Sequence, residues 1–304
     1  MTLLAKNPQL THMLDRLKAI PILLTLFLVN FIFRFISVKT VWNVGECLGT
    51  LCCRLMPKRR SIVDYNMEVV AAATQSFSPT PELTESIFQR NIANLVCTLK
   101  TYGMKPNQLA ELIDINVDPS FHLAVANNSG AVLCLAHMGN WEILSKLMPL
   151  VEPSPERFGA IYRPLDSKAA DDYVAAQRKE YNCEMFPKST PLGTLSTFIR
   201  EGGVMGILAD QRSGRPKKNK RLFFGKDSAR SKLPAVLHLR TGAPLFTLSV
   251  YSLSPGRWTI DILPINLPDK KLTTDEVVEH ITMSYQRDFS AHLLDVFWLH
   301  RYWK

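Results

Sequence analysis

His137 and Glu142, with four residues between them, are the side chains best suited to chemistry in this sequence. A short apolar run, Ala131–Ala136, ends directly at the histidine. Gly139 and Asn140 then form a turn, and the carboxylate follows on the first turn of an expected amphipathic helix. This layout suits a base that deprotonates a hydroxyl while the acid fixes the tautomer of the ring. It is the only His-x4-acid pair in the chain, but chance could supply one, so its strand–turn–helix setting gives it weight.

The elements that must position this pair alternate between strands and helices after residue 120. The expected strands are 131–136, 158–162, 204–208, 244–252 and 258–263, and the expected helices are 140–150, 166–181, 194–201, 231–241 and about 274–299. This alternation predicts an α/β fold, a mixed central sheet flanked by helices, with function at the carboxyl ends of the strands.

Three polar groups follow expected strands. They are His137, Arg163 with Arg178 on the helix after it, and Asp210 with Arg212. Loops at the strand ends would bring these groups to one rim of the sheet. Each also has an ordinary explanation: a histidine packed in the core, an arginine in a surface ion pair, or an aspartate capping a turn. Their joint arrangement at successive strand ends favours a site.

The net charge of +9 is concentrated rather than spread evenly. Residues 212–232 contain one acid, Asp227, and nine basic residues: Arg212, Arg215, Lys217, Lys218, Lys220, Arg221, Lys226, Arg230 and Lys232. A second basic group spans residues 54–60. Such clusters favour an anionic partner, such as lipid head groups, a phosphorylated glycolipid, an acidic carrier protein or nucleic acid, with a solvated loop as the alternative. The residues expected to bind substrate are Gly139, Asn140, Arg163, Arg212 and Arg230.

The N-terminal region, residues 1–39, is expected to be a membrane anchor. The stretch from Ala19 to Val38 is twenty residues, about the length that crosses 30 Å of hydrocarbon, although Asn30 and Arg34 interrupt it. It could span the membrane once, lie in the interface or be a buried soluble helix. Residues 40–304 would form one domain, helical over 40–118 and α/β over 119–304, on the cytoplasmic side where basic flanks concentrate.

Several other chemistries lack their motifs. The chain has no G-x-S-x-G elbow, no G-x4-G-K-[ST] phosphate loop and no H-E-x-x-H zinc motif. Six cysteines without C-x-x-C spacing predict reduced thiols rather than disulfides or metal ligands. Neither a metal nor a bound cofactor is expected.

Six segments occur together in an order that identifies a family. They are H-M-G-N-W-E (137–142), I-Y-R-P (161–164), D-Q-R-S-G (210–214), L-F-F-G (222–225), L-R-T-G-A-P (239–244) and F-W-L-H-R-Y-W-K (297–304). Over essentially the whole chain the sequence resembles the bacterial lipid A biosynthesis acyltransferases, the lauroyl and myristoyl transferases related to glycerolphosphate acyltransferases. Leu293-Leu-Asp295, where family members often have a Pro-Glu pair, leaves the acceptor open.

The resemblance implies an H-x4-D/E catalytic pair at His137 and Glu142, a functional arginine at Arg178 and a functional aspartate at Asp210. It also implies acyl transfer at the bacterial inner membrane, from acyl carrier protein (or coenzyme A) as co-substrate to a hydroxyl of a lipid A precursor. His137 would act as general base and Glu142 would orient it. Backbone N–H groups near Gly139 and Asn140, or an arginine, would stabilise the oxyanion.

Two alternatives remain at this point. The same pair could serve another lipid acceptor, such as a phosphatidylinositol mannoside, an ornithine lipid or a lysophospholipid. From a different class, the chain could be a membrane-associated binding protein for nucleic acid. That reading is weak, because the basic residues are not interleaved with stacking aromatic side chains. Formation of an acylated product from a thioester separates an enzyme from a binding protein.

Overall fold

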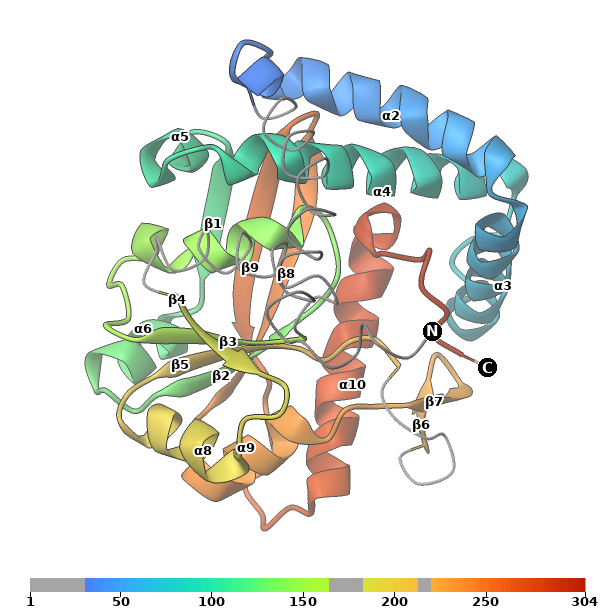
Figure 1. Cartoon of the computed structure of the whole chain (residues 1–304). Coiled ribbons are helices and arrows are strands. Elements are labelled where there is room, and N and C mark those ends of the chain that lie inside the picture. The colour runs from blue at the N-terminus through green and yellow to red at the C-terminus, as the bar shows by residue number, and fades with distance from the viewer. Residues whose placement is uncertain (1–30, 164–182, 213–219, 304) are drawn as a thin grey trace, which may run out of the picture.

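The computed structural model describes residues 31–163, 183–212 and 220–303. Its centre is a seven-stranded mixed sheet with strand order β1-β9-β8-β2-β5-β3-β4 (Figure 1). The strands are β1 (Ile113–Val117), β2 (Ala131–Leu135), β3 (Phe158–Tyr162), β4 (Cys183–Pro187), β5 (Val204–Leu208), β8 (Leu245–Ser254) and β9 (Arg257–Pro264). β8, β2, β5, β3 and β4 are parallel neighbours, and β9 reverses direction against β8.

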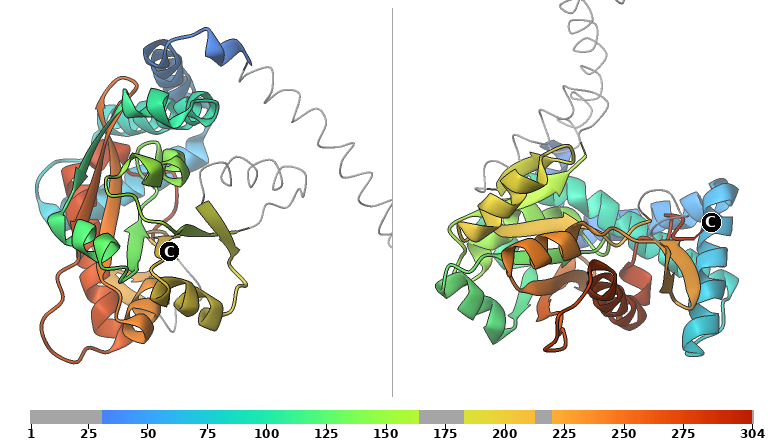
Figure 2. Two further views of the ribbon diagram at one scale, coloured as in Figure 1. Left: turned by 90° about the vertical axis from the view of Figure 1, so that its left-hand side faces the viewer. Right: turned by 90° about the horizontal axis from the view of Figure 1, so that it is seen from below.

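Helices cover both faces of the sheet (Figures 1 and 2). The helices are α2 (Val38–Leu55), α3 (Pro57–Thr74), α4 (Pro81–Tyr102), α5 (Pro106–Ala110), α6 (Pro119–Ala126), α8 (Leu192–Arg200), α9 (Leu233–Thr241) and α10 (Thr274–Ala291). Short 3₁₀ segments are η2 (Trp141–Lys146), η3 (Met148–Leu150) and η4 (Leu293–Asp295), and β6 (Lys220–Phe223) pairs with β7 (Lys226–Ala229) as a separate hairpin. The α/β fold with a mixed sheet flanked by helices is confirmed.

Strand β2 is buried on both faces, which explains its unbroken apolar sequence. Val132 and Cys134 point into a core shared with α8, α9 and α10. Leu133 and Leu135 point into a second core shared with α6 and η2. Alternation along a strand puts successive side chains on opposite faces, so one short segment connects both cores. His137, two residues after β2, therefore follows a strand that is fixed by packing on both faces.

The C-terminal segment after η4 returns to the carboxyl end of β2. Val296 forms an isolated antiparallel bridge with Met138. The backbone N–H of Phe297 donates to the carbonyl of His137 at 2.9 Å, and the N–H of Gly139 donates to the carbonyl of Asp295 at 2.8 Å. The last residues of the chain thus hold the loop that carries the histidine.

Several elements differ from the expectations. The closing helix ends at Ala291 instead of 299, because the tail pairs with the histidine loop. The helix expected over 140–150 is 3₁₀, and β1 lies in the region expected to be helical. The short strand β4 and the β6–β7 hairpin were not expected. The six cysteines, which all lie within the described residues, form no disulfide with one another.

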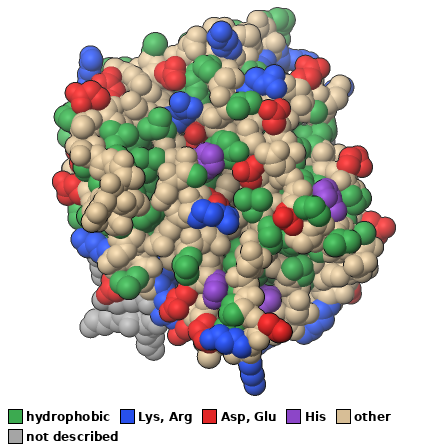
Figure 3. Space-filling view, turned by 180° about the vertical axis from the view of Figure 1, so that it is seen from behind, with side chains coloured by type: hydrophobic (Ala, Val, Ile, Leu, Met, Phe, Trp, Pro, Cys, Tyr) green, Lys and Arg blue, Asp and Glu red, His purple; other side chains and the backbone are tan. Residues whose placement is uncertain are grey.

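The expected membrane anchor and the helix 166–181 fall largely outside the described residues. Within the part of the chain that the structure describes, no helix is both long and apolar enough to cross a bilayer. On the face opposite to that of Figure 1, acidic and basic side chains are interspersed (Figure 3).

Helices α2 and α4 approach each other closely because of glycines in α2. A Cβ added at Gly45 would lie 2.5 Å from the Cα of Ala93 on α4. We predict that Gly45→Ala lowers the free energy of unfolding by about 1–3 kcal/mol, because the two helices must separate. Gly193→Ala on α8 is the matched control, since nothing lies within 4 Å of the added methyl. It should leave stability unchanged or raise it by up to about 1 kcal/mol. Urea unfolding checks both variants, and equal effects would contradict this account of the helix contact.

Candidate active site

Four adjacent parallel strands end in polar residues at one edge of the sheet. His137 follows β2, Asp210 follows β5, Arg163 follows β3 and Lys188 follows β4. These strands are consecutive in the sheet, in the order β2, β5, β3, β4. Because all four run in the same direction, their carboxyl ends meet on one rim. The structure places three of the expected strand-end residues, His137, Arg163 and Asp210, at this rim, and Lys188 lies there as well.

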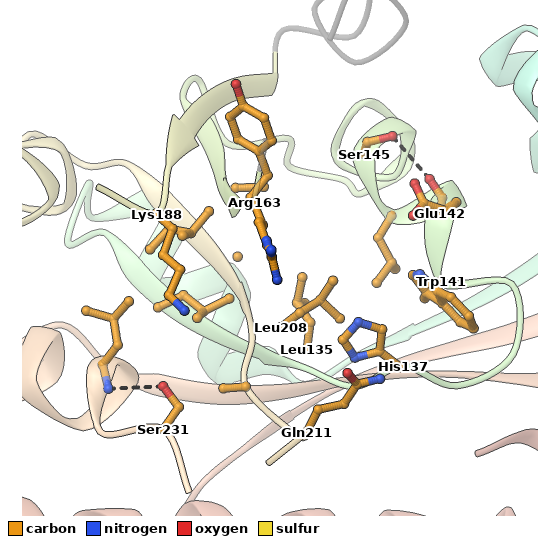
Figure 4. Close-up of a pocket in the computed structure, with 18 of the residues that line it drawn as sticks. Leu135, His137, Trp141, Glu142, Ser145, Arg163, Lys188, Leu208, Gln211 and Ser231 are labelled. Atoms are coloured by element: carbon orange, nitrogen blue, oxygen red, sulfur yellow. Dashed lines mark hydrogen bonds between the residues drawn. The ribbon is translucent and has the colours of Figure 1, made fainter. Parts of the chain in front are cut away.

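A cavity of about 540 Å³ opens at this rim (Figure 4). Its apolar lining comprises Leu135, Trp141, Leu144, Phe158, Ala160, Ile161, Met185, Gly206, Ile207, Leu208, Ala209 and Leu233. Its polar lining comprises His137, Glu142, Ser145, Tyr162, Arg163, Lys188, Gln211, Arg212, Ser231 and His300. In Figure 4, Arg163 and Lys188 reach into the space that His137 faces. A cavity that combines apolar walls with convergent polar side chains is typical of a ligand site.

The imidazole of His137 is hydrogen-bonded to the buried carboxylate of Asp210. Its Nδ1 lies 2.7 Å from Oδ1 of Asp210, whose side chain is fully buried, whereas the side chain of His137 is 21% exposed. A carboxylate at Nδ1 accepts a hydrogen bond from the N–H of that nitrogen, so the neutral ring carries its lone pair on Nε2. Nε2 is the other ring nitrogen, and the imidazole lines the cavity. This arrangement can remove a proton from a bound hydroxyl.

Burial and charge act in opposite directions on this pair. Burial lowers the pKa of His137, but the charge of Asp210, its hydrogen bond and the more weakly acting Glu142 together raise it above the ordinary 6.5. Burial raises the pKa of Asp210, but the neighbouring His137 and, less strongly, Arg230 bring it below the ordinary value. The two directions agree, because each group favours the charged form of the other.

The expectation that Glu142 orients the histidine is corrected by this geometry. Asp210 holds Nδ1, and a ring nitrogen with one proton has one such bond to give. Oε2 of Glu142 instead accepts a hydrogen bond from the hydroxyl of Tyr102 on α4, at 2.9 Å. Glu142 still lines the cavity and adds negative charge near the imidazole.

Asp210 has two further partners in the interior. The hydroxyl of Tyr302, in the C-terminal tail, donates to its Oδ2 at 3.1 Å. Arg230 supplies positive charge nearby and is 2% exposed. The Arg230 guanidinium lies over the ring of Phe223, 4.1 Å from its centroid, and its two terminal nitrogens have no hydrogen-bond partner among the described residues. The side chain of Arg230 is buried and is not part of the cavity lining, so the structure gives no support to the expectation that it binds substrate.

Gly139 and Asn140 serve the loop rather than the cavity. A Cβ at Gly139, where φ is +55°, would lie 2.6 Å from the carbonyl oxygen of Val250, and its N–H already donates to the tail. Asn140 is fully buried and exchanges hydrogen bonds with Thr98 and Thr101 on α4. Neither residue lines the cavity. Their expected substrate contact and the use of the Gly139 amide for an oxyanion are thus replaced by a structural role.

The remaining expected residues divide into two groups. Arg163 and Arg212 line the cavity as expected, whereas Arg178 lies outside the described residues. Sequence reasoning missed Lys188 and His300. Lys188 directly follows β4, so recognising the strand would have revealed it. His300 reaches the cavity only through the folded tail, and no local pattern indicates that.

Much of the basic segment 212–232 is engaged within the protein. Arg221 and Lys232 both form ion pairs with Asp275 at the start of α10. Lys226 lies over the ring of Tyr65, with 4.6 Å between Nζ and the centroid. Residues 213–219 lie outside the described part.

A carboxylate–imidazole pair beside a partly apolar cavity with cationic side chains is an arrangement suited to general base chemistry. The sequence matches the family model described as bacterial lipid A biosynthesis acyltransferase over residues 12–304. The chain therefore belongs to that family and is an acyltransferase. Among curated proteins, no match was found.

The titration of His137 tests the pairing directly. We predict a His137 pKa above 6.5 in the native protein and a lower pKa in Asp210→Asn, where burial remains and the charge is lost. Nuclear magnetic resonance of the ring protons across pH measures both values. Acyl transfer that needs the neutral ring should increase as pH rises through the same raised pKa. Asp114→Asn, which removes an exposed carboxylate paired with Arg257, is the control. An unchanged titration in Asp210→Asn would refute the pairing.

Proposed function

We propose that this protein transfers a fatty acyl chain from the thioester of acyl carrier protein to a hydroxyl of a lipid A precursor, at the cytoplasmic face of the bacterial inner membrane. The observation that carries the proposal is the His137–Asp210 pair, 2.7 Å apart, at the edge of the apolar cavity. The family supports acyl transfer in lipid A biosynthesis. The cavity supports a substrate with a hydrocarbon chain, because its lining is mostly apolar.

In the proposed reaction, Nε2 of His137 removes the proton of the acceptor hydroxyl as its oxygen attacks the thioester carbonyl. The tetrahedral intermediate collapses, the C–S bond breaks and the departing thiolate takes the proton from the imidazolium. The ester and the free thiol are then the products. No covalent enzyme intermediate is needed, since the thioester is already activated. General base catalysis of this kind contributes about 10²–10⁴-fold.

Two carboxylates stabilise the imidazolium in this scheme, with different roles. Asp210 holds the ring through Nδ1 in the geometry that leaves Nε2 free to accept a proton. Glu142 adds negative charge from the wall of the cavity and is positioned by Tyr102. Because the Gly139 amide is already engaged, Arg163 is the better candidate for the oxyanion, together with Arg178 from the sequence.

The cations at the cavity mouth would bind the anionic parts of the substrates. Arg163, Lys188 and Arg212 all line it. Phosphates of a lipid A precursor and of the carrier's phosphopantetheine arm are both suitable ligands for such a group. The apolar side chains of the lining, such as Phe158 and Leu208, would then contact the acyl chain.

Replacement of the base tests the proposed function. His137→Gln should reduce transfer from acyl carrier protein to a lipid A precursor by about 10²–10⁴-fold without unfolding the protein, because only the proton acceptor is lost. Mass spectrometry of the lipid product measures the rate and identifies the acceptor and hydroxyl. His280→Gln on α10 is the control and should keep its activity, because His280 does not line the cavity. Retained turnover in His137→Gln, or no product from native protein, would reject the proposal.

A second comparison separates the two carboxylates. Asp210→Asn should impair transfer more than Glu142→Gln, because Asp210 sets the tautomer and Glu142 contributes only charge. The values of kcat measured with saturating donor and acceptor decide the order. A reversed order would return the orienting role to Glu142.

Gly206 provides a test of the acyl site. It lies on β5 in the cavity lining, and an added Cβ would lie 3.1 Å from Cδ1 of Leu135. We predict that Gly206→Val shifts the preferred donor to a shorter acyl chain, since the side chain takes up cavity volume. Competition between donors of different chain length measures the shift. Gly193→Ala on α8, where nothing lies within 4 Å of the added methyl, is the control. An unchanged preference would place the acyl chain elsewhere.

A further inference from the structure

Helix α2 is packed on one side only. Its glycine face lies against α4, with Gly45 opposite Ala93 and Gly49 opposite Gln89. Trp42 on the same side is fully buried. Figures 1 and 2 show α2 on the outer side of α4, away from the sheet. The other side of α2 therefore faces out of the molecule.

That outer side carries an apolar stripe. Val44, Leu48, Leu51 and Leu55 are 50%, 41%, 49% and 70% exposed, respectively. Their spacing of four, three and four residues puts them in one row along the helix. Other exposed apolar side chains adjoin the two ends of α2: Phe31, Ile32, Phe35 and Met56. These eight residues are here called the α2 stripe. They follow one another along α2 and its two ends, whereas exposed leucines elsewhere on the surface are isolated.

The charges around the α2 stripe have one dominant sign. Between residues 31 and 60 there are six basic residues and a single acid, Glu46. The basic residues, all exposed, are Arg34, Lys39, Arg54, Lys58, Arg59 and Arg60. An apolar stripe flanked by arginine and lysine is the pattern of a helix that lies in the plane of a membrane interface. Anionic head groups attract such basic flanks.

We infer that the α2 stripe is embedded in the head-group region of an anionic bilayer, as a membrane contact within the folded part of the chain. The inference deepens the proposed function and rests on it for the lipid substrate. A second copy of the chain is a poorer occupant, because a symmetric pair would bring the same basic flanks together. In sequence the stripe begins at the end of the apolar run 19–33, which favours lipid contact at this end of the domain.

The location of the α2 stripe relative to the cavity fits this role. Nζ of Lys100 on α4 donates to the carbonyl of Phe33 at 2.5 Å. Two residues later, Tyr102 donates to Glu142 in the cavity wall. The last turn of α4 thus contacts both the start of the stripe and the site. Anchoring α2 in the interface would hold the cavity close to its lipid acceptor.

A fluorescent probe on the stripe tests the inference without requiring activity. The full chain carries an environment-sensitive fluorophore at Leu51→Cys, in a Cys47→Ser, Cys52→Ser background, and is reconstituted in vesicles of phosphatidylethanolamine and phosphatidylglycerol. The emission should shift to the blue and be quenched by brominated lipids. Met283→Cys on α10 in the same background is the control, since Met283 is also apolar and 61% exposed. Its probe should report water.

Aqueous emission at Leu51 in vesicles would overturn the inference, and so would cross-linking between copies through Leu51→Cys in place of quenching. Insertion of the probe in a protein that makes no product would leave the inference standing and reject the proposed function.

As a kinetic check, Leu48→Asp with Leu51→Asp should slow transfer to a vesicle-embedded acceptor by about tenfold, because two leucines lose their apolar contact. Transfer in detergent micelles should be unchanged, which shows that the variant folds. Equal loss in micelles and vesicles would contradict a membrane role.

Discussion

The fully buried carboxylate of Asp210 is the group on which the arrangement of the site depends. Removing an ion from water is costly unless other groups in the interior replace its hydration. Here His137 and Tyr302 contact the carboxylate directly, and Arg230 supplies a counter-charge beneath it. The imidazole is therefore one partner in a network that reaches from the cavity to the core.

The C-terminal tail completes this network. Tyr302 contributes the hydroxyl, while Asp295 and Phe297 bond to the backbone of the loop that carries His137. Asn66 on α3 in turn binds the carbonyls of Trp298 and His300. Segments from both ends of the described chain thus fix the position of one side chain. This explains why the aromatic residues near the C-terminus are buried rather than exposed.

The rim of the sheet and the outer side of α2 have different proposed roles. The parallel strands bring cations and the base to one rim of the sheet, where an apolar cavity meets them. Helix α4 links that rim to α2, through Tyr102 at one contact and the glycine face of α2 along the other. An acyltransferase that acts on lipids needs both a place for a hydrocarbon chain and access to the bilayer. The proposed roles of the cavity and the α2 stripe meet those two needs.

The sequence by itself determined the class of fold and the positions of the main chemical groups. The apolar run before His137 and the one before Asp210 predict strands, and parallel strands bring their ends together whatever the rest of the chain does. The resemblance to the family came from six motifs that occur in a fixed order along the chain, which can be read without knowing the fold. The partner of the imidazole did not, because Glu142 is near in sequence whereas Asp210 is near only across adjacent strands. The burial of Arg230 and the arrival of His300 were likewise decided by tertiary packing, since a hydrogen bond or an ion contact depends on distance in space and local sequence patterns report distance only along the chain.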